Sequence, residues 1–380
     1  MRFKRYEEVS LELLRAGLWR EEVAFPENFT DWDKVIQFAK TQSVMGIIAK
    51  SVLADKKYLD RIPNDFRLKL KSILVSNVMA FNSMTDALKK VTLTLTQAGI
   101  PHVLLKGHGM AVNYPYPELR QCGDIDLYVG KENAVASHKV LSGISEWIDP
   151  EFSATWGKHY SVKLDGVHIE VHRHTCSHSV KKYMKMYLDA AEKGLTQELG
   201  HVTYDGVDIA VPEVNFNAVY IFDHLFKHFL ISGIGLRHLS DWMLFLHANK
   251  DVLDHQRLKK LLEELDLLKP WQVFGTIVVK YLGMPKEEFP LYADSEHTDW
   301  AFEIVLSDGN FGKSTKYYTR RSDNYLKTKL NAIWCHLNRG AQMMRVFPRQ
   351  ETRHFYHVVA NYFRCLIGQI RTKKVKKINI

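Results

Sequence analysis

The sequence has little cysteine and no long apolar run, and both shortages narrow the class of protein. Only four of the 380 residues are cysteine, and none of them forms a CxxC pair. This excludes a disulfide scaffold and a cysteine zinc site, so we expect reduced thiols in a cytoplasmic protein. No stretch approaches the ~18 apolar residues of a membrane span. The first residues lack the apolar region of a signal peptide.

The glycine-rich motifs of the common nucleotide-binding folds are also missing. Neither GxGxxG nor GxxxxGK[ST] occurs, so dinucleotide-binding and P-loop folds have no support. The chain is 46% hydrophobic and 25% charged, which is ordinary for a globular protein and excludes a disordered or fibrous one.

Positive charge is abundant only near the C-terminus. The net charge is +9, but residues from Lys313 onward hold 16 of the 52 basic residues and two of the 43 acids. Everything before Lys313 is therefore net negative, by five charges. A polyanion or a membrane surface is a candidate partner of this basic tail, and a solvated helical face is the alternative.

Hydrophobic spacing divides the chain into three segments. Helical periodicity covers residues 1–98, strands and short helices mix over 99–212, and helical periodicity returns over 213–380. Within the first segment we expect helices over 11–19, 31–54 and 63–97. Because strands and helices do not alternate, we expect an α+β fold. Its nucleus is a mixed sheet with flanking helices, between an N-terminal helical region and a C-terminal helical domain with the basic tail.

Two acids lie on one expected strand. Asp124 and Asp126 are two residues apart within DIDLYV, so period-two geometry puts both carboxylates on one face. Two carboxylates this close repel unless a cation lies between them, and oxygen ligands suit Mg²⁺ or Mn²⁺.

Two Asp-Gly pairs, at 165–166 and 205–206, predict hairpins with type I′ turns. The first predicts Ser161 opposite Glu170 and His159 opposite His172. Its polar face then offers Glu170 as a third carboxylate for the Asp pair.

A glycine-containing turn precedes the acids. Lys106-Gly107-His108-Gly109 joins a short apolar run to an expected helix. Glycines allow backbone N–H groups to approach a ligand, and a helix N-terminus favours an anion. Together with three acids, such a turn is typical of two-metal phosphoryl or nucleotidyl transfer.

At these residues the sequence resembles a known family. LLKGHGMAVNYPYPELRQCGDIDLYV, the later VHIEVH, and HLFKHFLISGIGLRHLSDW resemble the uncharacterised nucleotidyltransferases of the polymerase-β-like superfamily, over roughly residues 8–250. The wider superfamily has Gly-Ser or Gly-Gly where this chain has Lys-Gly, and often Asp where it has Glu170. The matching motif residues are Lys106, Gly107, Arg120, Asp124, Asp126, Glu170 and His172.

The resemblance implies a metal-dependent nucleotidyltransferase of the polymerase-β-like fold. Asp124, Asp126 and Glu170 would hold two Mg²⁺ (or Mn²⁺) ions, and Glu170 would help to deprotonate the acceptor. A nucleoside triphosphate such as ATP would give its nucleoside monophosphate to an unknown small molecule, saccharide or protein. The expected nucleotide-binding residues are Lys106, Gly107, His108, Gly109, Arg120, His172, His224 and Arg237.

A second cluster lies on the expected C-terminal helices. His224 and His228 are four residues apart and share a helix face, and Arg237, His238 and Asp241 follow a glycine break. By the same resemblance, these helices would close over the substrate. Arg237 and His224 would contact phosphate, and Asp241 would orient one of them. The alternative is that these side chains only pack within the protein.

Two rival functions stay open. A glycosyltransferase could use Asp-x-Asp to hold a metal on a nucleotide sugar, but that fold normally begins with a β-α-β half. A non-catalytic module that binds nucleotide or polyanion is the second rival, and intact acids at all three positions speak against it.

Overall fold

The computed structural model describes most of the chain. The described residues are 2–23, 28–54, 59, 62–150, 152, 158–175, 191, 194–312, 325–356 and 359. Cys176, Cys365 and the basic end of the tail, 371–380, lie outside the described residues.

The N-terminal segment is helical, as predicted, but its helix over 31–54 is divided. Ser43 has a φ of 57°, in the left-handed region, and this conformation ends one helix before the next begins. The single long helix expected there was wrong, whereas the helix expected over 63–97 is confirmed. The four helices are α1 (Arg5–Trp19), α2 (Trp32–Thr41), α3 (Met45–Ala54) and α5 (Asn64–Gln97).

The middle segment forms a five-stranded mixed sheet in the order β1-β2-β5-β4-β3, which confirms the α+β prediction. β2 and β5 are parallel neighbours, and the other pairs are antiparallel. The strands are β1 (Val103–Leu104), β2 (Ile125–Tyr128), β3 (Trp147–Ile148), β4 (His159–Leu164) and β5 (Val167–His172). The connecting helices are η1 (Gly107–Asn113), η2 (Pro117–Leu119) and α6 (Gly130–Ser142).

Both predicted hairpins form. β4 pairs with β5 in the predicted register, and β6 (Gly200–Tyr204) pairs with β7 (Val207–Val211) as a separate two-stranded sheet. The Asp and the Gly of each turn have positive φ, as a type I′ turn requires.

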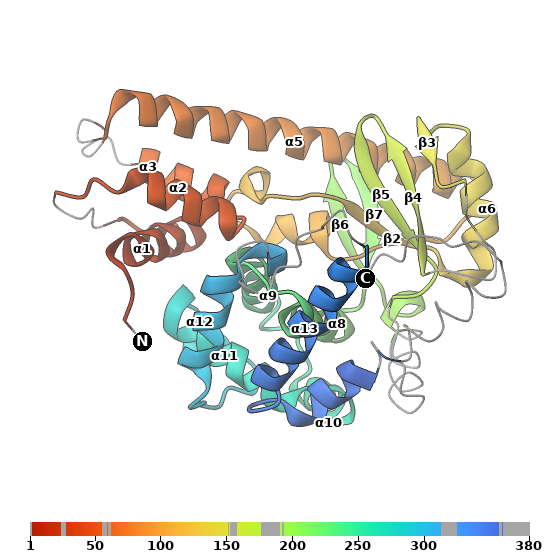
Figure 1. Ribbon diagram of the computed structural model, residues 1–380. Coiled ribbons are helices and arrows are strands. Elements are labelled where there is room, and N and C mark those ends of the chain that lie inside the picture. The colour runs from red at the N-terminus through yellow and green to blue at the C-terminus, as the bar shows by residue number, and fades with distance from the viewer. Residues whose placement is uncertain are drawn as a thin grey trace.

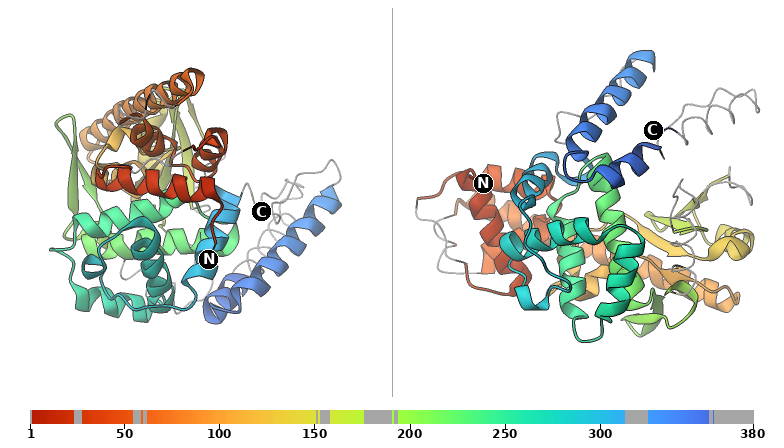
Figure 2. Two further views of the ribbon diagram at one scale, coloured as in Figure 1. Left: turned by 90° about the vertical axis from the view of Figure 1, so that its left-hand side faces the viewer. Right: turned by 90° about the horizontal axis from the view of Figure 1, so that it is seen from below.

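The C-terminal segment is helical, and its described helices lie below the sheet in the view of Figure 1. Its helix α13 lies at the edge of the molecule and extends away from the body (Figure 2). None of the described helices has the length and apolar character that a membrane span needs. The helices are α8 (Val214–Ile231), α9 (Leu236–Ala248), α10 (His255–Glu264), α11 (Leu268–Leu282), η3 (Lys286–Glu288), α12 (Thr298–Asp308), η4 (Asn310–Gly312) and α13 (Tyr325–Met343).

Two hydrophobic cores organise these elements. The larger core joins the N-terminal helices to α8, α9, α11 and α12, and the smaller one lies between the sheet and α5. Helix α5 belongs to both, with Phe66 and Leu70 in the larger core and Leu88 and Leu95 in the smaller. The three-part division of the chain stays a prediction; α5 ends at Gln97 and β7 at Val211, close to its boundaries.

Candidate active site

Three carboxylates meet at the parallel pair of strands. Asp126 on β2 is the register partner of Glu170 on β5, and Asp124 immediately precedes β2. The apolar neighbours Ile125 and Leu127 are buried in the sheet's core, which leaves the acids on the opposite face. The sheet thus brings together acids that are more than 40 residues apart in the sequence.

Asp126 is fully buried and is held from both sides. Lys106 Nζ lies 2.6 Å from Oδ2, and His172 Nε2 lies 2.7 Å from Oδ1. Burial alone would raise the pKa of Asp126, but Lys106 and His172 together lower it well below its usual range. Asp126 is therefore an ionised carboxylate, and Lys106 supplies the positive charge beside it.

Asp124 lacks such a partner. Its half-buried carboxylate has no hydrogen bond or ion pair among the described residues. Burial, and then repulsion by Asp126, raise its pKa, while Lys106 and Arg237 oppose the rise. An unpaired carboxylate beside an ionised one is relieved by a cation, so this part of the cluster suits a divalent metal.

Glu170 faces two imidazoles. Its Oε2 lies 3.4 Å from His172 Nε2, and its Oε1 lies 3.6 Å from His159 Nε2. The contact with His172 is the main reason that the pKa of Glu170 is lowered. Within the described chain, His159, Glu170 and His172 form the group whose ligand atoms all lie within 4.8 Å of one another. The ligand atoms of Asp124, Asp126 and Glu170 do not all lie within that distance of one another. Lys106 and His172 contact the two oxygens of Asp126.

The turn after β1 differs from the expected cradle. Gly107 has a φ of 60°, which suits glycine, and a Cβ there would lie 3.7 Å from Asp126 Oδ2. The helix that follows is a 3₁₀ helix of seven residues, and the Gly109 N–H donates to the Lys106 carbonyl at 3.2 Å. Gly107 thus lies beside the acids, whereas the N–H of Gly109 is used within the turn.

The His108 side chain points into the protein. It is fully buried, its Nε2 lies 3.0 Å from Thr85 Oγ1, and its ring stacks on Tyr204 at 5.0 Å. Burial lowers the pKa of His108 to about 4, so the ring is neutral at physiological pH. The structure does not bring this side chain to the acids.

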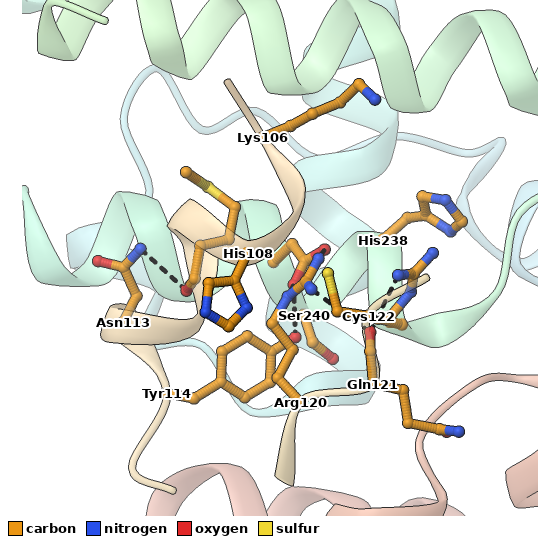
Figure 3. A network of polar contacts seen from close by, with 12 residues as sticks. Lys106, His108, Asn113, Tyr114, Arg120, Gln121, Cys122, His238 and Ser240 are labelled. Atoms are coloured by element: carbon orange, nitrogen blue, oxygen red, sulfur yellow. Dashed lines mark hydrogen bonds and ion pairs between the residues drawn. The ribbon is translucent and has the colours of Figure 1, made fainter. Parts of the chain in front are cut away.

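Arg120 is bound to the C-terminal helices rather than exposed to the site. Its Nε and Nη2 donate to the two oxygens of Asp241 on α9, both at 2.7 Å, and the Tyr114 hydroxyl donates to Oδ1 at 2.7 Å. Tyr114 and Arg120 converge in Figure 3, while Lys106 extends away from them. The expectation that Asp241 orients His224 or Arg237 was wrong, because a buried guanidinium needs its counter-charge.

Three histidines and Arg237 from α8 and α9 form a cluster near Lys106. The rings of His224 and His228 are 4.5 Å apart, and burial, followed by the charge of Lys106, lowers the pKa of both. His238 lies next to His228, with ring centroids 6.3 Å apart. Arg237 donates to the Gln121 carbonyl at 3.0 Å and is near enough to Asp124 to lower its pKa. His224 and His228 therefore lie near Lys106, and Arg237 lies near Asp124.

Sequence reasoning did not single out Lys158 or His159 as residues of this site. Lys158, just before β4, is half-buried, and burial, Lys106 and Lys227 lower its pKa. Its ammonium has no hydrogen-bond or ion-pair partner among the described residues. No sequence signal marked Lys158, whereas the predicted register already placed His159 opposite His172.

Comparisons with known proteins identify the family of this chain. The family model described as "Uncharacterised nucleotidyltransferase" matches residues 28–283. No curated protein matches the sequence. Among solved structures, an antigenic nucleotidyltransferase-like protein from Paracoccidioides brasiliensis is similar over 52% of this chain and 93% of that chain. It has 14% identity and a TM-score of 0.31, which is too distant to bear on the site. The chain belongs to the uncharacterised nucleotidyltransferase family, whose general reaction is nucleotidyl transfer.

Proposed function

We propose that the protein transfers a nucleoside monophosphate from a nucleoside triphosphate to an acceptor hydroxyl and releases pyrophosphate. The observation that supports this most is the in-register pairing of Asp126 with Glu170, beside an unpaired Asp124. Divalent cations, Mg²⁺ or Mn²⁺, held by Asp124, Asp126 and Glu170 would offset the triphosphate charge and make the acceptor hydroxyl more acidic.

The cationic side chains near the acids suit the binding of a triphosphate. The charges of Lys106 and Arg237 act on Asp124, and Lys158 has no ion-pair partner among the described residues. Lys106 and Lys158 repel each other, which contributes to the lowered pKa of Lys158, and a triphosphate is an anion that would offset this repulsion. We assign Lys158 and Arg237 to the phosphates, and Lys106 to the phosphates and to Asp126.

Glu170 is the base in this scheme. Its lowered pKa keeps it ionised at neutral pH, and about a third of its side chain is exposed to an incoming acceptor. The acceptor oxygen bonds to the α-phosphorus, the bond to pyrophosphate breaks, and Glu170 takes the hydroxyl proton. Arg120 acts indirectly, because its pair with Asp241 fixes the segment that leads to Asp124 and Asp126.

The acceptor is a small molecule, a saccharide or a protein in this proposal, and ATP is the first donor to test. The basic tail is assigned to a polyanion or a membrane surface near the acceptor. Its last residues, 371–380, can be deleted to test that assignment, since unchanged binding and activity would contradict it.

The decisive variant is Asp126→Asn. It preserves the shape of a side chain that Lys106 and His172 contact, whereas Asp126→Ala would leave Lys106 without its partner. We expect wild-type protein to bind triphosphates with Mn²⁺ or Mg²⁺ and to release pyrophosphate in an acceptor screen. Asp126→Asn should lose both.

Asp208→Asn is the matched control, since Asp208 is an exposed acid on the separate hairpin. Full activity of Asp126→Asn, or wild-type binding of nucleotide sugars in preference to triphosphates, would contradict the proposal.

A further inference from the structure

We propose that His159, together with His172 and Glu170, forms a mixed nitrogen and oxygen site that prefers Mn²⁺ and similar transition metals to Mg²⁺. The inference rests on the proposed function, in which Glu170 holds a metal, and it adds His159 as a ligand. His159 is not among the acids and motif residues that the family resemblance marks.

The ligand atoms already lie at metal-binding separations. His159 Nε2 and His172 Nε2 lie 3.6 and 3.4 Å from the two oxygens of Glu170, and all three ligand atoms fit within 4.8 Å. Ligands bound at about 2.1 Å are roughly 3 Å apart when they are adjacent and about 4 Å apart when they are opposite. A single ion can therefore reach all three with small side-chain movements.

The backbone holds these groups in place. His159 and His172 are register partners on β4 and β5, and Glu170 lies two residues before His172 on the same face. His172 Nε2 lies 2.7 Å from Asp126 Oδ1, so an ion that binds this nitrogen takes the place of the proton that the two groups share. His172 and Asp126 are almost wholly buried, whereas about a third of the side chains of His159 and Glu170 is exposed. An ion can thus enter from solvent at His159 and Glu170.

The donor set decides the choice of metal. Mg²⁺ is a hard ion that takes oxygen ligands and sheds water reluctantly. Imidazole suits transition metals such as Zn²⁺ and Fe²⁺, and Mn²⁺, although it also favours oxygen ligands, accepts imidazole more readily than Mg²⁺ does. Two imidazoles beside one or two carboxylates therefore favour a transition metal over Mg²⁺. The alternative is that His159 only pairs with Glu170 across the strands, in which case its removal leaves the metal preference unchanged.

The test measures Mn²⁺ binding to the full chain by electron paramagnetic resonance and records electron spin-echo modulation from ¹⁴N. We expect wild-type protein to show imidazole ¹⁴N modulation. His159→Gln should reduce it and raise the Kd for Mn²⁺ about tenfold or more, with the Kd for Mg²⁺ changed less than about twofold. His168→Gln is the matched control, because His168 is an exposed histidine on the same face of β5.

Two results would overturn the inference. One is wild-type Mn²⁺ without ¹⁴N modulation, and the other is a His159→Gln protein that binds Mn²⁺ as the His168→Gln protein does. These failures are separate from failure of the proposed function. Nucleotide transfer with unchanged Mn²⁺ binding in His159→Gln defeats only the inference, whereas a nitrogen-ligated Mn²⁺ site in a protein without transfer defeats only the proposed function.

Discussion

Substitution of Arg120 should destabilise the protein far more than substitution of an exposed arginine. The guanidinium makes two bonds of 2.7 Å to Asp241, and the two side chains are 2% and 9% exposed. Loss of one partner from such a buried pair leaves an uncompensated charge and typically costs about 3–5 kcal/mol. Arg120→Met should therefore destabilise the protein by that amount.

This cost converts into a measurable melting shift. A chain of 380 residues has an unfolding entropy of about 0.8 kcal/mol per kelvin, so about 3–5 kcal/mol corresponds to a fall in Tm of roughly 4–6 °C. The assay is thermal and denaturant unfolding of Arg120→Met, Asp241→Leu and the double variant. The double variant should lose much less unfolding free energy than the two single variants lose together, because it removes both charges.

Lys69→Met is the matched control, since the Lys69–Asp33 pair at 3.4 Å is exposed, with side-chain exposures of 52% and 92%. Its removal should change stability by no more than about 0.5 kcal/mol. The reasoning is refuted if Arg120→Met costs less than about 1 kcal/mol, or if the losses from the single variants simply add in the double variant.

Three further outcomes follow from the site and its surroundings. Asp124→Asn should lower nucleotide transfer about 100-fold yet raise the metal-free melting temperature at pH 7, because it removes a carboxylate that burial and Asp126 penalise; a lower melting temperature would contradict this. Lys158→Met should raise the KM for triphosphate about tenfold with a smaller change in kcat, while Lys163→Met on the exposed part of β4 should not. Burial raises the pKa of Glu351 to about 7 from 4.5, so the folded state keeps a proton that the unfolded state releases, and stability should fall as pH rises from about 4.5 to 7. Unfolding of Glu351→Gln across this range should lack that part of the pH dependence, and an identical profile would disprove the assignment.

Local patterns were enough to predict the sheet register. Period-two alternation and the Asp165-Gly166 turn predicted every pair from Leu164–Val167 to His159–His172, because a two-residue turn leaves one alignment of the strands. The same alignment put Glu170 on the polar face. No local pattern predicted that β2 and β5 are neighbours. We expected Asp126 and Glu170 to lie close together only because metal binding would use both carboxylates.

Long-range partners could not be predicted in this way. Arg120 and Asp241 are 121 residues apart, and nothing in the residues near Arg120 distinguishes a buried ion pair from a phosphate contact. The division of 31–54 into two helices was missed for a different reason. Its break depends on the left-handed conformation of Ser43, a residue with no strong turn signal, while the apolar spacing continues on both sides.

Backbone amide hydrogens along helix α5 should exchange with solvent at different rates. Its 34 residues span about 50 Å, with deeply buried side chains near Leu70 at one end and from Met84 onward at the other. Between these ends the helix is mostly exposed, and Asn77 and Ser83 bond back to the helix backbone. Amide hydrogens at the two ends are therefore protected by two different cores, whereas those in the central turns depend on the helix alone. Opening of the larger core can therefore leave the amide hydrogens from Met84 onward protected, because the smaller core holds that end of the helix.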